Sequence, residues 1–120
     1  MKRPSEHELN KKIAAAKQAI QETSYTFVDG EKIVGELDEL ELNTEDVWGK
    51  ILICLDEIRT SDYEGQRPPA KSYEKRIKNK ELFAFCWDSK SMKKRMYLKF
   101  CIADSCFWYV SFHETRIETK

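Results

Sequence analysis

The fold is decided by two neighbouring stretches, Arg95-Met-Tyr-Leu-Lys-Phe-Cys-Ile102 and Cys106-Phe-Trp-Tyr-Val-Ser-Phe-His113. In both, two sets of side chains alternate, which is typical of a β-strand with one face in a core and one in water. The side chains expected in the core are Met96, Leu98, Phe100 and Ile102 from the first stretch and Trp108, Val110 and Phe112 from the second. The two stretches therefore predict an antiparallel hairpin.

The loop of this hairpin must keep both apolar sets on one side, because a slip of one residue turns every side chain to the other face. That requirement favours an odd loop, Ala103-Asp104-Ser105. The expected cross-strand pairs are Lys99 with Tyr109, Tyr97 with Ser111, and Arg95 with His113. Directly opposed residues are within contact distance. One face would thus gather cations, hydroxyls and an imidazole, which suits a phosphate-containing ligand.

The start of the chain has the periodicity of a helix. Ser5, with Glu8 three residues later, matches a capping box. Apolar residues at helical spacing then predict a first helix over roughly 5–22: Leu9, Ile13, Ala16 and Ile20. A short strand-like segment, 24–28, follows and ends at the turn signal Asp29-Gly30.

Two more helices are predicted before residue 60. A short second helix is indicated by Ile33, Val34, Leu37 and Leu40. Asn43 or Thr44 can cap a third helix. Its apolar stripe, expected in the core, consists of Val47, Trp48, Ile51, Leu52, Leu55 and Ile58.

From Thr60 to about Lys80 the chain turns polar and contains the pair Pro68-Pro69. An irregular segment is expected there, because proline cannot donate to a β-ladder and disfavours helix before it. A loop of that length is often functional. A further strand is indicated by the alternation of Phe83, Phe85 and Trp87. This order predicts one α+β domain over residues 1–120, with N-terminal helices packed on a small C-terminal antiparallel sheet.

The composition indicates a soluble protein of the cytoplasm. No apolar run approaches the length needed to cross a bilayer, and no signal-peptide pattern follows Met1. Four cysteines lie in apolar segments without CxxC spacing: Cys54, Cys86, Cys101 and Cys106. Reduced core cysteines are expected in preference to a zinc site, and no metal or other cofactor is predicted.

The net charge of zero conceals a division along the chain. Residues 1–60 carry 8 Lys or Arg against 13 Asp or Glu, whereas residues 61–120 carry 13 against 8. Within 67–99 the count is 11 against 3. Such clustering favours a polyanion, because neutralised phosphates release counterions. The simpler interpretation is a solvated lysine-rich loop.

Five segments occur in one order along the chain: Ser24-Tyr-Thr-Phe-Val28, Leu40-Glu-Leu-Asn-Thr-Glu-Asp-Val47, Asp62-Tyr63-x-Gly65, Tyr97-Leu-Lys99 and Val110-Ser-Phe-His-Glu114. With them the chain resembles the MqsR-type toxins of bacterial toxin–antitoxin modules, over about Lys2 to Arg116. The resemblance implies a RelE-like fold and metal-independent endoribonuclease activity on messenger RNA, free or on the ribosome. It also implies a cognate antitoxin protein as partner.

The resemblance implies site residues as well. Tyr97 and Lys99 match the family's Tyr-x-Lys strand, and Tyr63 falls where a tyrosine begins its Tyr-x-x-Gly or Tyr-Lys-Ser element. His113 follows Ser111-Phe112, where the better-known members carry a lysine important for cleavage.

Cleavage of RNA needs no nucleophile from the protein, because the 2′-hydroxyl attacks the adjacent phosphorus. It needs a base, an acid and cations for the developing charge. We predict His113 as general acid or base, since histidine titrates near neutrality. Lys99 and Arg95 would stabilise phosphate charge, and Tyr97 would orient the phosphate or transfer a proton. Residues predicted to contact flanking RNA, with a tyrosine stacking on a base, are Tyr63, Arg67, Lys93, Lys94, Tyr109 and Ser111.

Each of these residues also has a simpler interpretation. His113 can also be interpreted as a surface residue hydrogen-bonded to a neighbour. Lys99 can be an ordinary outward-facing strand lysine, and Tyr97 can simply cover the sheet. The alternative function is therefore a non-catalytic RNA- or protein-binding module on the same fold, and a structural interaction protein is a third. Cleavage of RNA, as opposed to binding alone, separates the first from the others.

Overall fold

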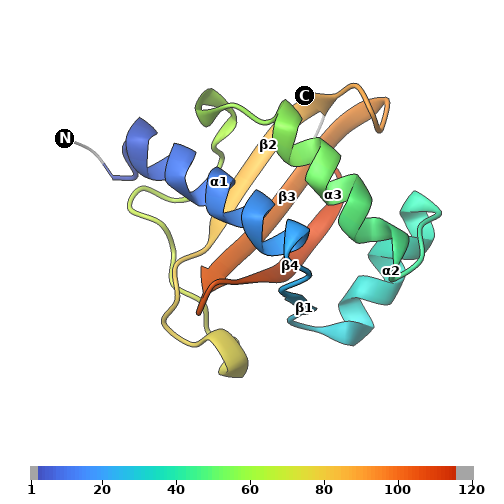
Figure 1. Ribbon diagram of the computed structural model, residues 1–120, viewed down its shortest axis with the longest axis horizontal. Coiled ribbons are helices and arrows are strands. Elements are labelled where there is room, and N and C mark those ends of the chain that lie inside the picture. Colours follow the sequence, from blue (N-terminus) through green and yellow to red (C-terminus); the bar gives the residue numbers. More distant parts are fainter. Residues whose placement is uncertain (1–2, 116–120) are drawn as a thin grey trace, which may run out of the picture.

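The computed structural model describes residues 3–115, in which helices come first and a β-sheet follows (Figure 1). The predicted α+β class is confirmed. The elements are α1 (Glu6–Gln21), β1 (Tyr25–Phe27), α2 (Gly30–Leu40), α3 (Asp46–Glu57), the 3-10 turns η1 (Thr60–Asp62) and η2 (Lys75–Ile77), β2 (Phe83–Ser89), β3 (Lys94–Ala103) and β4 (Cys106–Glu114).

The helices begin where short polar side chains satisfy their first backbone N–H groups. Ser5 Oγ accepts from Glu8 N at 3.1 Å at the start of α1, which is one half of the predicted capping box. The Glu8 carboxylate, which a capping box directs to Ser5 N, pairs with Arg3 instead. Asn43 Oδ1 accepts two backbone N–H groups just before α3. The second helix starts at Gly30, before the predicted apolar pattern, because Asp29 is its cap as well as part of a turn.

The sheet has the strand order β1-β4-β3-β2. Its three C-terminal strands are antiparallel, as expected. The short β1, however, runs parallel to β4, so that the sheet is mixed and not purely antiparallel. Backbone bonds from Phe107 N to Ser24 O and from Val28 N to Tyr109 O extend this pairing on both sides.

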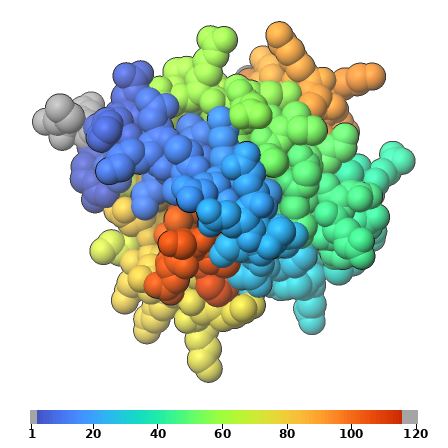
Figure 2. Space-filling model, viewed as in Figure 1, coloured from blue at the N-terminus to red at the C-terminus, as the bar shows by residue number. Residues whose placement is uncertain are grey.

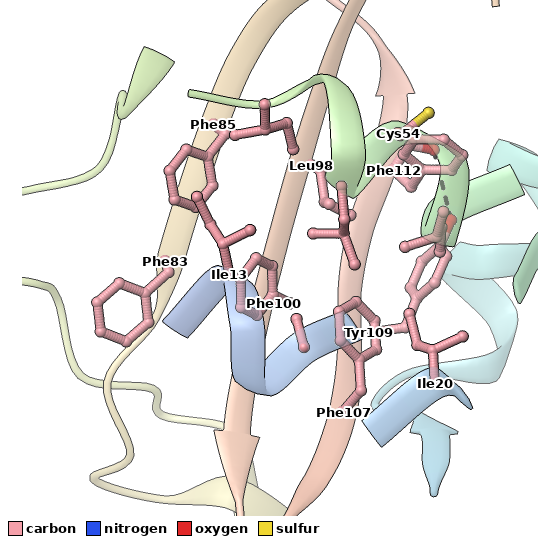
Figure 3. Packing of buried hydrophobic residues seen from close by; sticks show 14 of the residues in the cluster. Ile13, Ile20, Cys54, Phe83, Phe85, Leu98, Phe100, Phe107, Tyr109 and Phe112 are labelled. Atoms are coloured by element: carbon pink, nitrogen blue, oxygen red, sulfur yellow. Dashed lines mark hydrogen bonds between the residues drawn. The ribbon is translucent and has the colours of Figure 1, made fainter. Parts of the chain in front are cut away.

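Helices α1 and α3 cover one side of the sheet, and their side chains fill the middle of that side (Figures 1 and 2). The core lies between these two layers. In Figure 3 side chains of the sheet meet Ile13 and Ile20 of α1 and Cys54 of α3. Those labelled from the sheet are Phe83, Phe85, Leu98, Phe100, Phe107, Tyr109 and Phe112.

The hairpin between β3 and β4 differs from the prediction in its turn. The turn has two residues, Asp104 and Ser105, with φ values of 55° and 60°, the left-handed pair of a type I′ hairpin. A bulge follows in β4: Lys99 pairs with Ser111 and Phe100 with Tyr109, which leaves Val110 as the extra residue. The two-residue turn and the one bulged residue together add an odd number of residues. This keeps the apolar side chains of β3 and those at the end of β4 on one face, as the predicted three-residue loop also would.

The bulge changes which side chains of β4 face the core. Phe107 and Tyr109 point inward and are fully buried, so their predicted place on the wet face is wrong. Trp108 and Val110 lie on the opposite side of the sheet, so their predicted place in the main core is also wrong. Beyond the bulge, Phe112 returns to the core as predicted.

The side of the sheet away from α1 and α3 is called the outer face, and it carries the odd-numbered residues of β3 from Arg95 to Ala103. Part of it is covered by the segment 64–82. Ile77 of η2 is buried there against Cys101 and Ala103. Arg76 lies over the Trp108 ring, 4.9 Å from its centroid. The part of the outer face toward the start of β3 and the end of β4 stays half-exposed.

A basic aromatic site on the outer face

The half-exposed part of the outer face contains a hollow of about 390 Å³, called the central hollow. Its lining residues are Lys32, Tyr97, Lys99, Ser111, His113 and Thr115. Four of these were predicted from the hairpin pattern, and the structure brings them together. Lys32 comes from α2 and Thr115 follows β4.

Tyr97 and His113 form the aromatic part of this hollow. They are directly opposite each other on β3 and β4, whereas the sequence pattern predicts Tyr97 opposite Ser111 and Arg95 opposite His113. Their rings stack with centroids 5.1 Å apart and planes 21° from parallel. Burial raises the pKa of the Tyr97 phenol, and nearby Cys86, Glu64 and Tyr63 raise it further, so that the hydroxyl keeps its proton.

The backbone sets the orientation of the His113 ring. Its Nδ1 lies 2.8 Å from the carbonyl oxygen of Glu114. Because a carbonyl oxygen only accepts, Nδ1 is the donor in this bond. Nε2 is then the nitrogen that can take up or release a proton.

Lys99 provides a cation next to this stack. It lies opposite Ser111, and its side chain is half-buried. Burial lowers the pKa of its ammonium, neighbouring Lys32 lowers it further, and Glu36 acts in the opposite direction. Besides the central hollow, Lys99 lines two adjoining hollows of about 330 Å³ and 190 Å³.

Glu36, which the sequence reasoning did not select, holds this part of β4 in place. It is only 4% exposed. Its carboxylate accepts from Tyr109 OH at 2.9 Å, Ser111 Oγ at 2.7 Å and Phe112 N at 2.9 Å. These bonds join α2 to β4 at the last residue that pairs with β1, Tyr109, and just beyond it. Its position between Ile33 and Leu37, on the buried side of α2, was a signal available in the sequence.

Six predicted site residues lie outside the central hollow, and three of them are cations in the β2–β3 turn or at the start of β3. Arg95 is exposed and pairs with Asp88 of β2 at 3.2 Å. Lys93 lies in the β2–β3 turn with a φ of 61°, and Lys94 alternates onto the helix side of β3. None of these cations is among the residues that line the central hollow.

Two tyrosines predicted to stack on bases are buried. Tyr63 is 6% exposed, its ring meets Phe85, and its hydroxyl donates to Gln66 O. Arg67 covers the Tyr63 ring, 5.0 Å from its centroid. Tyr109 lies on the core side because of the bulge. Neither ring offers a face to a base, so the stacking role predicted for them is wrong.

Among residues 3–115 no group of three or more His, Cys, Asp or Glu side chains is placed to hold a metal ion. Cys54, Cys86 and Cys101 are buried free thiols, and burial raises the pKa of Cys54 and Cys101 to about 11.

None of the helices in residues 3–115 combines the length and the apolar composition that a membrane span needs.

Comparisons of this chain with models of protein families, with curated proteins and with solved structures find no match. Function is therefore inferred below from the geometry of the central hollow and from the sequence motifs that resemble MqsR-type toxins.

Proposed function

We propose that this protein is an endoribonuclease that cleaves messenger RNA, and that it acts as the toxin of a bacterial toxin–antitoxin pair. The observation that carries the proposal is the stacked pair of Tyr97 and His113 beside Lys99 and Lys32 in one open hollow. The sequence resemblance to MqsR-type toxins supports the second half of the proposal, including a cytoplasmic location and an antitoxin partner.

The chemistry assigned to the hollow follows from what RNA brings. The 2′-hydroxyl is the nucleophile, so the protein must remove its proton, protonate the leaving 5′-oxygen and stabilise the phosphorane. His113 Nε2, the nitrogen left without a proton when Nδ1 donates to Glu114 O, accepts the proton of the 2′-hydroxyl. Lys99 and Lys32 lie where they can hold the phosphate oxygens. Positioned acid–base groups contribute about 10²–10⁴-fold to such reactions, and fixed charges often contribute more.

Besides this base, the reaction needs an acid that donates a proton to the leaving 5′-oxygen. Tyr97 keeps its phenolic proton because burial raises its pKa. Lys99 has a lowered pKa, which makes its ammonium a better acid than an exposed lysine. Both groups line the same hollow as His113, so either can act across one bound phosphate.

A non-catalytic RNA-binding module is the second candidate, and one observation favours it. The central hollow contains a single imidazole, whereas acid–base cleavage of RNA near neutrality uses two proton-exchanging groups. If neither Tyr97 nor Lys99 serves as the partner of His113, the same residues bind a phosphate without breaking it.

The test uses purified protein and two end-labelled single-stranded oligonucleotides of the same sequence, one RNA and one with 2′-deoxy sugars. Both are incubated in EDTA, with and without translating ribosomes. The proposal predicts that only the RNA is cut, leaving 2′,3′-cyclic phosphate or 3′-phosphate ends. Binding of both oligonucleotides with no cutting under either condition would establish the binding module instead.

A further inference from the structure

The strongest unassigned feature is the ring of Tyr73, which is 96% exposed. It lies in the segment 64–82 that crosses the outer face. With the part of the chain described here, its side chain makes no hydrogen bond or ring contact. An aromatic ring exposed in this way contributes nothing to the core, and its face is accessible to a ligand.

The backbone beside this ring is nevertheless fixed. Ser72 is buried, and its N donates to Lys80 O at 2.9 Å while its carbonyl oxygen accepts from Asn79 N at 3.0 Å. Ser72 Oγ also accepts from Glu74 N at 3.0 Å. Tyr73 is therefore presented from an anchored position, which reduces the entropy lost when a ligand binds to it.

Tyr73 lines the adjoining hollow of about 330 Å³, called the second hollow. This hollow shares Lys32 and Lys99 with the central hollow, so the two meet at a pair of cations. Lys71 adds a third cation. The apolar part of the lining comes from Val28, Ala70, Leu82 and Val110.

Two carboxylates also line the second hollow. Asp29 is engaged at the start of α2, where it accepts from Glu31 N at 3.1 Å and Lys32 N at 3.3 Å. Glu74 has no such engagement of its carboxylate in residues 3–115. Three lysines and one carboxylate without a bonding partner among the described residues, Glu74, therefore set the charge of the second hollow, which favours an anionic ligand. Removing the charge of Glu74 should then strengthen the binding of that ligand.

We infer that the second hollow is a nucleotide subsite for single-stranded RNA, in which an unpaired base stacks on Tyr73. This inference rests on the proposed function. Lys32 and Lys99 hold the phosphate between the two hollows, and the apolar lining receives the sugar and the edge of the base. Only an unpaired base presents a free face, so paired RNA is excluded from this subsite.

The test measures binding and cleavage separately. Affinity for a short single-stranded RNA is measured by fluorescence anisotropy in the His113→Ala protein, which would bind without cutting. Adding Tyr73→Ala should weaken binding about tenfold, the loss typical of one stacked base, whereas Tyr73→Phe should retain it. Glu74→Gln should tighten binding. Ile53→Ala, an exposed apolar residue of α3 on the opposite side, is the matched control.

Cleavage by otherwise wild-type protein is followed in parallel, and Tyr73→Ala should raise KM with little change in kcat. If wild type cuts RNA and Tyr73→Ala changes neither affinity nor KM, the subsite is refuted and the nuclease proposal stands. Loss of binding in Tyr73→Ala without any cutting by wild type supports the subsite and refutes the nuclease. A wild type that neither binds nor cuts RNA overturns both.

Discussion

Tyr97 on β3 and His113 on β4 are cross-strand neighbours whose rings stack at a centroid distance of 5.1 Å. Both positions lie in the paired part of the sheet, so the backbone ladder fixes the geometry of the stack. Because His113 Nδ1 donates to Glu114 O, Nε2 is the ring nitrogen that can accept or donate a proton. In the proposed nuclease these two side chains would act as acid and base, and their fixed position on the sheet would supply the preorganisation that catalysis requires.

The hydroxyl of Tyr97 can be tested apart from its ring. Tyr97→Phe keeps the stack on His113 and removes only the proton donor, so cleavage should fall by about 10²-fold with RNA affinity unchanged. The measurement is a single-turnover rate with saturating protein. A Phe variant as fast as wild type would assign the leaving-group proton to Lys99 instead.

Replacing Lys99 should stabilise the protein while abolishing cleavage. Its pKa is lowered in the folded state, so the folded protein binds a proton less readily than the unfolded chain. This penalty is fully present below the folded pKa and disappears as pH rises toward the ordinary value of 10.5. Lys99→Met should therefore unfold at higher urea than wild type at pH 7, with a gap that narrows as pH rises toward 10.5.

The result contradicting this account is a Lys99→Met protein that is less stable than wild type at pH 7. Lys90→Met, in the β2–β3 turn, is the control, because Lys90 is exposed and its replacement removes one charge without relieving burial.

Removing the Glu36 carboxylate should destabilise the junction of α2 and β4. Glu36→Ala leaves the hydroxyls of Tyr109 and Ser111 and the N–H of Phe112 without their acceptor, which should cost about 3 kcal/mol of unfolding free energy. Chemical denaturation measures the loss. Asp38→Asn, exposed on the same helix, should change stability little, and equal effects of the two substitutions would show that the buried carboxylate is dispensable.

Glu57 should make stability depend on pH in the acid range. Burial acts to raise its pKa, but bonds from Ser89 Oγ, Trp87 Nε1 and Ser91 N together lower it below the ordinary 4.5. This stabilisation is fully present above pH 4.5 and is lost as pH falls through the folded pKa. Glu57→Gln should cost about 2 kcal/mol near neutrality and flatten the acid dependence.

The indole of Trp87 donates to Glu57, so its fluorescence reports this contact directly. An unchanged acid unfolding midpoint in Glu57→Gln would assign the acid sensitivity to other carboxylates.

The strand pattern was sufficient to predict one half of the hairpin but not the other. The alternation in β3 holds throughout, because it contains no bulge. In β4 the extra residue Val110 reverses the faces of Phe107, Trp108 and Tyr109. Keeping the apolar side chains of both strands on one face requires one additional residue, but the pattern does not say whether that residue lies in the turn or in a strand. The turn is also hard to recognise, because Asp104-Ser105 lacks the glycine that usually marks a type I′ turn.

The candidate site was predicted where it depends on β3 and on β4 beyond the bulge. Tyr97, Lys99, Ser111 and His113 therefore meet, although in a register different from the predicted one. Lys32 could not be inferred, because it reaches the hollow through the packing of α2 against β4. Sequence patterns describe the faces of single elements, whereas this contribution depends on how two elements meet.

The most direct test of the central claim compares single-turnover RNA cleavage by wild type, His113→Ala and His7→Ala. His7 is exposed on α1, which covers the side of the sheet opposite the outer face, and its replacement is the same chemical change. We predict that wild type and His7→Ala cut at the same rate and that His113→Ala is slower by about 10²-fold or more while still folded. Equal rates for all three proteins would place the cleavage site elsewhere.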